Sequence, residues 1–269
     1  MQLPAGPALV CRPLEGHAAH FFTAKRWRLG ASSVLLSDPG AWLEVAEAMD
    51  VDSGRLKRLR QVHGAEAVSH RRGAATGESG QPEADIVMSD DPALALAVQT
   101  ADCVPILVAD PRKRVVAAVH AGWRGLVARA PVMAVERLAA DFGSRAADLV
   151  VAVGPAIAAC CYEVGGDVRA RFEDAGFSAP QLDRWFSRDP VASRVNPAMP
   201  SLSPDRKVGH WFFDASQAAR DELASAGVSR GRIFVSGLCT ASHPDVFCSY
   251  RRDGAPAGRM SASIRLVRP

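Results

Sequence analysis

Two strongly apolar segments separated by a short polar turn constrain the fold of this chain more than any other feature. Residues 104–109 and 114–120 consist largely of Val, Ala and Leu, and the intervening Asp-Pro-Arg-Lys, residues 110–113, has the composition of a turn. The pattern predicts a β-hairpin in which Cys103 pairs directly with His120. Directly opposite side chains have Cβ atoms about 4.5–5.5 Å apart. The pair therefore predicts either metal ligands or a nucleophile with its base.

A glycine turn and a third candidate ligand extend this constellation. The Ala-Gly-Trp-Arg-Gly sequence at 121–125 precedes an expected helix, and such a turn presents free backbone N–H groups to an anion. Arg124 adds a positive charge there. His63 lies on the same face of an expected strand as Leu59 and Gln61. One thiolate and two imidazoles make a zinc site with an open fourth position, as in catalytic zinc sites.

Short strands and fewer helices interleave along the rest of the chain. This predicts a mixed α/β protein with one domain spanning residues 1–269. Further strands are expected at 94–99, 149–153, 208–213, 232–236, 246–250 and 260–267, and helices at 40–49 (behind Asp38-Pro39), 126–142 and, capped by Asp214, up to residue 226. Segments 73–83 and 178–207, rich in Gly, Ser, Thr or Pro, are expected to be loops, the second a mobile lid or insertion.

Composition and charge exclude several classes of protein. A net charge of +3 is too mild to indicate nucleic-acid binding, but it suits an anionic small substrate. No apolar run reaches 18 residues and no signal peptide is apparent, so we expect a cytoplasmic protein without a membrane span. We also expect it to be a monomer. The six cysteines are then expected as reduced thiols, since adjacent Cys160 and Cys161 would bridge each other only with strain.

Two further segments carry candidate binding residues. Arg251 and Arg252 are suited to bidentate phosphate binding, although the following Asp-Gly pair is also typical of a solvated hairpin turn. Residues 154–165 are expected to leave a strand and enter a glycine-bounded turn. This segment forms either a wall of the site or a structural turn with buried thiols.

These segments together resemble the laccase-domain family, also called polyphenol-oxidase-like, whose members are regarded as zinc-dependent purine nucleoside phosphorylases. The resemblance runs in family order over roughly residues 56–267. It is carried by Gln61-Val62-His63-Gly64, Ala84-Asp85 with Ser89-Asp90, Thr100-Ala101-Asp102-Cys103, His120-Ala121-Gly122-Trp123-Arg124-Gly125, Gly154-Pro155 to Cys161-Tyr162-Glu163-Val164, and Ser249-Tyr250-Arg251-Arg252-Asp253-Gly254.

The resemblance implies a four-layer α/β (α+β) sandwich of mixed sheets. It also implies zinc and catalysis at His63, Cys103 and His120. The implied reaction is phosphorolysis of adenosine, inosine or guanosine to the base and ribose 1-phosphate, with hydrolytic deamination of adenosine beside it. The partners are then a purine nucleoside and phosphate, and the candidate phosphate ligands are Arg124, Arg251 and Arg252. For the proton shuttle of a deaminase, Asp102 and Glu163 are the candidates.

Residues 1–55 depart from the family pattern. Where relatives carry His-Gly-Phe-Phe-Thr-Arg, this chain has Ala-His-Phe-Phe-Thr-Ala at 19–24. Ala24 therefore stands at the arginine position. If that arginine binds phosphate in relatives, Lys25 and Arg26 are the candidate substitutes.

Three other functions are consistent with parts of the sequence. A metal-free cysteine hydrolase would use Cys103 as nucleophile and His120 as base, and bound zinc would exclude it. The older family name implies a copper-dependent polyphenol oxidase, but seven histidines without any His-x-His pattern exclude a multicopper cluster. A single copper replacing zinc in vitro remains open. A non-catalytic partner protein predicts that His63→Ala leaves function unchanged.

Overall fold

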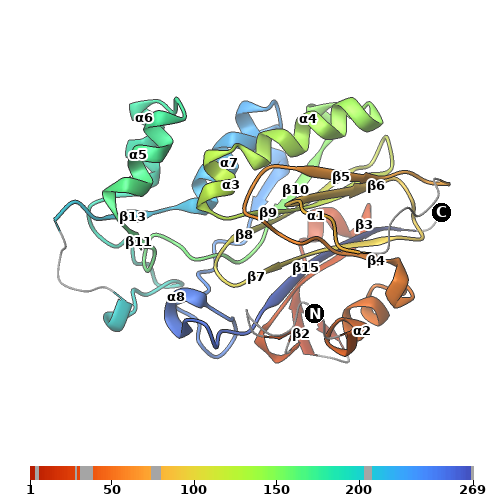
Figure 1. The fold of residues 1–269 in the computed structure, drawn as a ribbon, viewed down its shortest axis with the longest axis horizontal. Coiled ribbons are helices and arrows are strands. Elements are labelled where there is room, and N and C mark those ends of the chain that lie inside the picture. The colour runs from red at the N-terminus through yellow and green to blue at the C-terminus, as the bar shows by residue number, and fades with distance from the viewer. Residues whose placement is uncertain (4–5, 28, 31–38, 74–79, 203–207, 268–269) are drawn as a thin grey trace.

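Helices and sheets stack in four layers (Figure 1). In the computed structural model, helices α3 (Trp123–Val127), α4 (Ala130–Phe142) and α7 (Ala215–Ser225) cover one sheet, a second sheet packs against it, and α2 (Pro39–Ala48) covers the second sheet. The predicted four-layer mixed α/β fold is therefore confirmed. The structure describes residues 1–3, 6–27, 29–30, 39–73, 80–202 and 208–267. No helix in these ranges is long and apolar enough to cross a bilayer.

The two central sheets have six strands each, and a small third sheet stands beside them. The first sheet has the order β14 (Ile233–Val235), β10 (Val150–Val153), β8 (Val104–Asp110), β9 (Val115–Ala121), β6 (Ile86–Ser89), β5 (Ala67–His70). The second has the order β1 (Gln2–Leu3), β2 (Gly6–Leu9), β3 (Ala18–Thr23), β15 (Met260–Leu266), β7 (Ala95–Thr100), β4 (Leu56–Lys57). The third comprises β11 (Glu163–Val164), β13 (Trp211–Phe213) and β12 (Phe186–Ser187). The remaining α-helices are α1 (Arg12–Glu15), α5 (Gly166–Asp174), α6 (Ala179–Trp185) and α8 (Tyr250–Asp253).

Strand β9 shows how the layers position a polar side chain. Val115 and Val119 face the helices, whereas Val116 and Ala118 face the second sheet. Side chains alternate along a strand, so His120 continues the set that faces the second sheet. The ladder ends one residue later at Ala121, which leaves His120 at the margin of the core between the sheets.

The predicted hairpin is correct, but its predicted register is wrong. His120 pairs with Pro105 instead of Cys103, and Asp110 pairs with Val115. Asp110 extends the ladder because its carboxylate accepts the backbone N–H groups of two turn residues at 2.8 and 3.0 Å. The shift of two residues preserves the alternation of faces, so Cys103 and His120 still lie on the same side of the sheet.

The helix expected at 126–142 is two helices. Arg129 adopts a left-handed conformation, φ 58°, between α3 and α4. Pro131 lies in the first turn of α4, where its missing N–H costs no hydrogen bond. The break limits α3 to five residues. The glycine segment at 121–125 therefore leads into a short separate helix.

The expectation of a loop throughout 178–207 is also wrong. Ser178 begins α6 through a capping box with Gln181, and strand β12 follows directly. Trp185 packs edge-on against Phe172 of α5. Residues 203–207 lie outside the described residues, as do 74–79 of the other expected loop and the expected cap Asp38.

The strand expected at 246–250 is absent, and the strand expected at 208–213 is limited to β13. The backbone N–H groups of Val246 and Phe247 both donate to the carbonyl of His243, which makes a turn. Ser249 then accepts the N–H of Arg252 and caps α8. The apolar pattern that indicated a strand belongs to a small satellite of the core around Phe247.

A buried carboxyl on α7 makes stability depend on pH. Glu222 is 1% exposed, and neither carboxyl oxygen has a hydrogen-bond partner among the described residues. Burial raises its pKa well above the ordinary 4.5, although the charge of Arg129 opposes the shift. Above about pH 4.5 the folded state therefore retains a proton that the unfolded state releases, and the free energy of unfolding falls as pH rises.

We expect Glu222→Leu to raise the free energy of unfolding at pH 8 by about 1–3 kcal/mol, because it removes a buried polar group without a partner. Urea unfolding at pH 5 and pH 8 checks this, and the difference between the two pH values should shrink in the variant. Glu136→Leu, on the exposed side of α4, is the control and should change stability by less than about 0.5 kcal/mol. A destabilised Glu222→Leu protein at pH 8 would contradict the prediction.

Candidate metal centre and active site

Three side chains from separate segments converge at the end of the β8–β9 hairpin. The ligand atoms of His63, Cys103 and His120 all lie within 4.8 Å of one another. His63 is exposed, Cys103 is half-buried and His120 is buried, so the group opens to solvent on one side. The two imidazole rings are 4.9 Å apart, centroid to centroid, and nearly perpendicular at 83°. The structure thus brings together the three ligands that the sequence predicted.

Asp85 joins two of these residues, and the sequence reasoning missed it. Its Oδ1 lies 2.8 Å from His120 Nδ1, and its carboxylate accepts the backbone N–H groups of His63 at 3.1 Å and Gly64 at 2.7 Å. Strand β6 pairs antiparallel with β9, which places Asp85 directly beside His120. The only signal in the sequence was the Ala-Asp dipeptide at 84–85, because the β6–β9 pairing joins segments far apart in the chain.

His63 reaches the group from a bend, and the expectation that it lies on a strand is wrong. Its backbone is left-handed, with φ 62°. Gln61 fixes the bend by exchanging two hydrogen bonds with the backbone of Gln99, at 2.9 and 2.7 Å. These bonds and those of Asp85 hold a conformation that costs a non-glycine residue about 1–3 kcal/mol.

Gly122 is the residue that lets the ligands approach. A Cβ atom at this position would lie 3.0 Å from both Cys103 Sγ and His63 Cδ2. We expect Gly122→Ala to lower metal affinity about 10-fold or more, because both ligands must move while the fold is kept. Isothermal titration with Zn²⁺ checks this, with Gly54→Ala as control, since a Cβ there meets nothing within 4 Å. Equal affinities of both variants and the wild type would contradict it.

The electrostatics of the group favour an ion pair in the metal-free protein. Burial opposes ionisation of Cys103, but the charge and hydrogen bond of His120 lower its pKa to about 6. Burial likewise opposes protonation of His120, yet the Cys103 thiolate and Asp85 raise its pKa to about 9. The Asp85 pKa is lowered despite burial, because His120 and backbone N–H groups donate to the carboxylate. Near neutral pH the thiolate is thus already formed.

Asp102, beside Cys103, holds the C-terminal segment against the site. This buried carboxylate accepts Thr240 Oγ1 at 2.5 Å, Ser249 Oγ at 3.0 Å and the N–H of Arg251 at 2.6 Å. Burial raises the pKa of Asp102 although these donors oppose the shift. Its φ of 92° is strained, and the donors hold it in place. Asp102 therefore positions the backbone around Cys103.

Of the predicted phosphate ligands, Arg252 is occupied elsewhere. Its guanidinium donates to the carbonyls of Thr240, Ala241 and Phe247 and pairs with Asp253, so it braces the C-terminal segment. Arg252 therefore has a structural role in the C-terminal segment, and its guanidinium is not available to phosphate. The sequence pattern does not separate it from its neighbour Arg251, because only the tertiary structure orients the two side chains.

Arg251 and Arg124 lie near the group instead. Arg251 stacks on Tyr162, 5.1 Å from the ring centroid, and donates to the Glu163 carbonyl. Arg124 stacks on Trp123 at 4.4 Å and is exposed. Burial raises the pKa of Tyr162 well above its ordinary value in spite of both guanidinium charges, and the Cys103 and Asp102 charges act in the same direction as burial. Both guanidinium groups and the Cys103 thiol are therefore close enough to Tyr162 to act on its charge.

Of the other sequence candidates, Arg26 is exposed, and Lys25, Asp102 and Glu163 are engaged with other groups. Lys25 Nζ donates to the Pro244 carbonyl at 3.0 Å, and Ala24 is buried. Glu163 Oε1 lies 2.9 Å from His210 Nδ1. The candidate proton shuttles Asp102 and Glu163 are thus both engaged with other groups.

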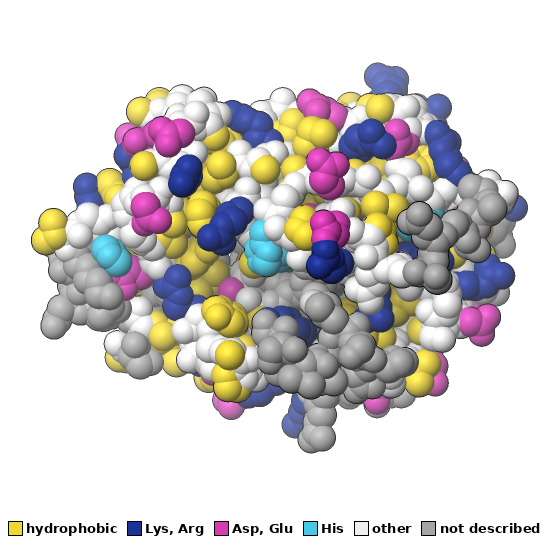
Figure 2. Space-filling view, in the orientation of Figure 1, with side chains coloured by type: hydrophobic (Ala, Val, Ile, Leu, Met, Phe, Trp, Pro, Cys, Tyr) yellow, Lys and Arg dark blue, Asp and Glu magenta, His cyan; other side chains and the backbone are white. Residues whose placement is uncertain are grey.

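The donor chemistry fits a transition-metal ion. One thiolate and two imidazoles match catalytic zinc, and copper also accepts this set. The buried Asp85 at Nδ1 of His120 leaves the other ring nitrogen to face the group, which is how carboxylates orient metal-binding histidines. Figure 2 shows histidine and Lys or Arg side chains exposed next to each other near the middle of this face, among charges of both signs.

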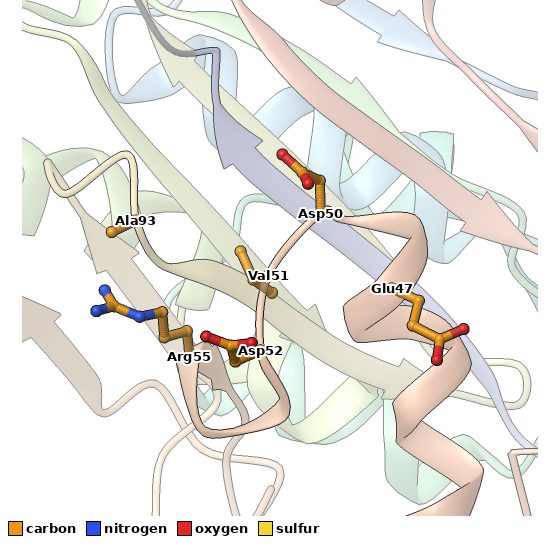
Figure 3. Close-up of a pocket in the computed structure, with 6 residues that line it drawn as sticks. All are labelled: Glu47, Asp50, Val51, Asp52, Arg55 and Ala93. Carbon is orange, nitrogen blue, oxygen red and sulfur yellow. The ribbon is translucent and has the colours of Figure 1, made fainter.

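A large hollow elsewhere lacks comparable chemistry. It has a volume of about 590 Å³ and lies beside the end of α2, where Asp50, Asp52 and Arg55 line it (Figure 3). Asp50 pairs with Arg265 at 3.3 Å. None of the three clustered ligands borders this hollow.

Comparisons with known proteins agree with the fold and the motifs. Over 224 residues the chain is 36% identical to a purine nucleoside phosphorylase of Deinococcus radiodurans, covering 83% of this chain and 75% of that protein. It is 34% identical over 212 residues to purine nucleoside phosphorylase YfiH of Escherichia coli, covering 78% and 73%. The crystal structure of YlmD from Geobacillus stearothermophilus matches with a TM-score of 0.77 and 27% identity, covering 99% of this chain and 98% of that one.

A second solved structure and a family model complete the comparison. The Bacillus licheniformis hypothetical protein YfiH shares the fold, with a TM-score of 0.80 at 24% identity over 99% of this chain and 98% of that one. The model described as multi-copper polyphenol oxidoreductase laccase matches residues 41–267. The chain therefore belongs to this laccase-domain family, as its motifs indicated.

Proposed function

We propose that the protein is a zinc-dependent purine nucleoside phosphorylase. The observation that carries the proposal is the convergence of two imidazoles and a thiol within 4.8 Å, with Arg251 stacked on Tyr162 and Arg124 close enough to act on the same tyrosine. The printed names of the Deinococcus radiodurans and Escherichia coli relatives support the substrate class. Phosphorolysis breaks the bond between the purine nitrogen and C1′ of the ribose, and a phosphate oxygen forms the new bond to C1′.

In this proposal one set of residues would bind the zinc ion, and a second set would bind the phosphate. His63, Cys103 and His120 would bind zinc, which supplies a Lewis acid with one open position. Asp85 fixes the ring of His120 and the bend before Gly64, so the ligands need little rearrangement. Asp102 keeps the segment that carries Arg251 against Cys103.

The two cations match what phosphate and the transition state require. A guanidinium binds phosphate oxygens bidentately and carries its charge at every relevant pH. Cleavage at C1′ develops positive charge on the ribose, as in other glycosyl transfers, and a nearby phosphate anion stabilises it. Arg124 is the more available of the two, because Arg251 already donates to the Glu163 carbonyl.

We expect Arg124→Ala to raise the KM for phosphate about 10-fold or more, because one charge-assisted contact contributes about 1.5–3 kcal/mol. Steady-state kinetics at saturating nucleoside and varied phosphate check this. Arg58→Ala is the matched control, since Arg58 also stacks on a tryptophan, Trp42, at 4.7 Å from the ring centroid. An unchanged KM for phosphate in Arg124→Ala would remove this residue from the anion site.

The decisive experiment follows the products of the zinc-loaded protein. Adenosine, inosine and guanosine are incubated with and without phosphate, and the products are separated by chromatography. Free base and ribose 1-phosphate that form only with phosphate would support the proposal. Free ribose without phosphate would indicate hydrolysis, inosine from adenosine would indicate deamination, and either as the sole reaction would overturn it. Absence of product from metal-loaded protein would also overturn it. Assaying the copper-loaded protein with a phenol tests for the oxidase activity that the older family name implies.

A metal-free cysteine hydrolase is the second candidate, because one observation favours it. Cys103, His120 and Asp85 form a chain of thiolate, imidazolium and carboxylate, the order found in cysteine hydrolases. A cysteine-hydrolase mechanism would give His63 no role. Activity that survives chelation and the His63→Ala change, and alkylation of Cys103 that blocks it, would favour this candidate.

A further inference from the structure

A second group of ligands lies in the core, and no step proposed above uses it. The Sγ atoms of Cys160, Cys161 and Cys239 lie within 4.8 Å of one another, and all three side chains are fully buried. Strands β10 and β14 pair in parallel, so the segments that follow them leave the sheet at the same end. The bridge between Ala156 and Cys239 continues this pairing and brings the cysteines together.

The surroundings of the group favour a thiolate. The backbone N–H of Ala158 donates to Cys239 Sγ at 3.4 Å. Backbone N–H groups that donate to a buried sulfur are an expected second shell of a metal-bound thiolate.

The geometry and the neighbours fit a soft cation. Ligand sulfurs at about 2.3 Å from one ion lie about 4 Å from each other, which agrees with the observed cluster. The thioether residue Met199 packs against the cluster together with apolar side chains such as Ile157 and Ala241. Adjacent Cys160 and Cys161 would form a disulfide only with strain. The three described ligands contain no oxygen, which disfavours Mg²⁺ and Ca²⁺.

We propose that Cys160, Cys161 and Cys239 form a second metal site, which binds one soft closed-shell cation, Zn²⁺ or Cu⁺, through three sulfurs. The ion joins the segment that ends at Tyr162 to the segment that carries Thr240, whose hydroxyl holds Asp102. Bound there, it stabilises the wall of the first site without taking part in the reaction.

Cd²⁺ binding to cysteine variants distinguishes the second metal site from the first, because the two sites use different cysteines. Cys103→Ala removes the only thiol of the first site, so thiolate-to-Cd²⁺ absorption that remains in this variant and depends on Cys239 reports on the second. We expect Cys103→Ala protein to bind Cd²⁺ with that absorption and to lose it with Cys239→Ala. The control combines Cys103→Ala with Cys248→Ala, which removes another buried thiol. This double variant should keep the Cd²⁺ absorption unchanged. Displacement of Cd²⁺ by Zn²⁺ and by Cu⁺ then distinguishes the two ions.

Thermal unfolding establishes that each variant is folded. If Cys239→Ala does not fold, Cys160→Ala and Cys161→Ala replace it, and each should weaken Cd²⁺ binding about 10-fold or more. Absence of thiolate absorption in Cys103→Ala protein would overturn the proposal. Absorption that survives the loss of Cys239, or a disulfide between Cys239 and either neighbour in the isolated protein, would overturn it as well.

Discussion

Cys103→Ala is expected to lower the proposed phosphorolysis by about 10³-fold or more, because the variant loses the only anionic ligand of the proposed three-residue metal centre. A metal ion that polarises a reacting group contributes several kcal/mol to the transition state, and each 1.36 kcal/mol is a factor of ten in rate. Two imidazoles alone bind zinc far more weakly than the complete set. The measurement is kcat/KM for inosine with metal content determined on the same sample.

The control for this change is Cys11→Ala, which removes another half-buried thiol far from the ligands in the sequence. That variant should keep its metal and its activity. If Cys103→Ala protein retained activity within a few-fold of the wild type, the proposed metal centre would be wrong. Loss of metal in Cys103→Ala together with unchanged activity would mean that the reaction proceeds elsewhere on the molecule.

Asp85→Asn is expected to lower metal affinity about 10- to 100-fold, because it removes the negative charge that orients His120. The amide also places an N–H₂ group against backbone N–H donors of the His63 bend, which the carboxylate now accepts at 2.7–3.2 Å. The first effect changes the orientation of His120 and the second changes the bend that carries His63, but neither removes a candidate metal ligand. Zn²⁺ titration and the pH dependence of binding measure the loss, and phosphorolysis at saturating zinc should recover in part.

Asp110→Asn is the matched control for this second change. Asp110 is also a buried aspartate that accepts two backbone N–H groups, but it lies at the opposite end of the hairpin from the ligands. Its substitution should lower stability and leave zinc affinity unchanged. If both variants lost affinity equally, the effect of Asp85 would be a general loss of fold, and its role as a positioning residue would be wrong.

The sequence predicted the hairpin and its faces because both depend on local pattern. Apolar alternation around a polar turn places Cys103 and His120 on one side of the sheet, and an error of two residues in register does not change that. Phe247 and Ser249 show the limit of the same argument. Their alternating pattern indicated a strand, yet a turn at His243 and the Ser249 cap made a short helix instead.

The roles of Arg251 and Arg252 also depend on the tertiary structure. Arg251 and Arg252 are neighbours with the same chemistry, so the sequence offered both as phosphate ligands. The structure orients one over Tyr162 and the other into three backbone carbonyls. Only the packing of the C-terminal segment on the core decides which guanidinium remains near the ligands.

The sequence by itself determined the class of fold, the family and the three residues proposed as metal ligands, because these follow from residue types at short spacing and in a fixed order. Only the tertiary structure decided that Asp85 joins His120 to the His63 bend, and that Cys160, Cys161 and Cys239 meet in the core. These groups depend on pairing between β6 and β9 and between β10 and β14. Such pairing unites segments far apart in the chain, and no local pattern records which strands become neighbours.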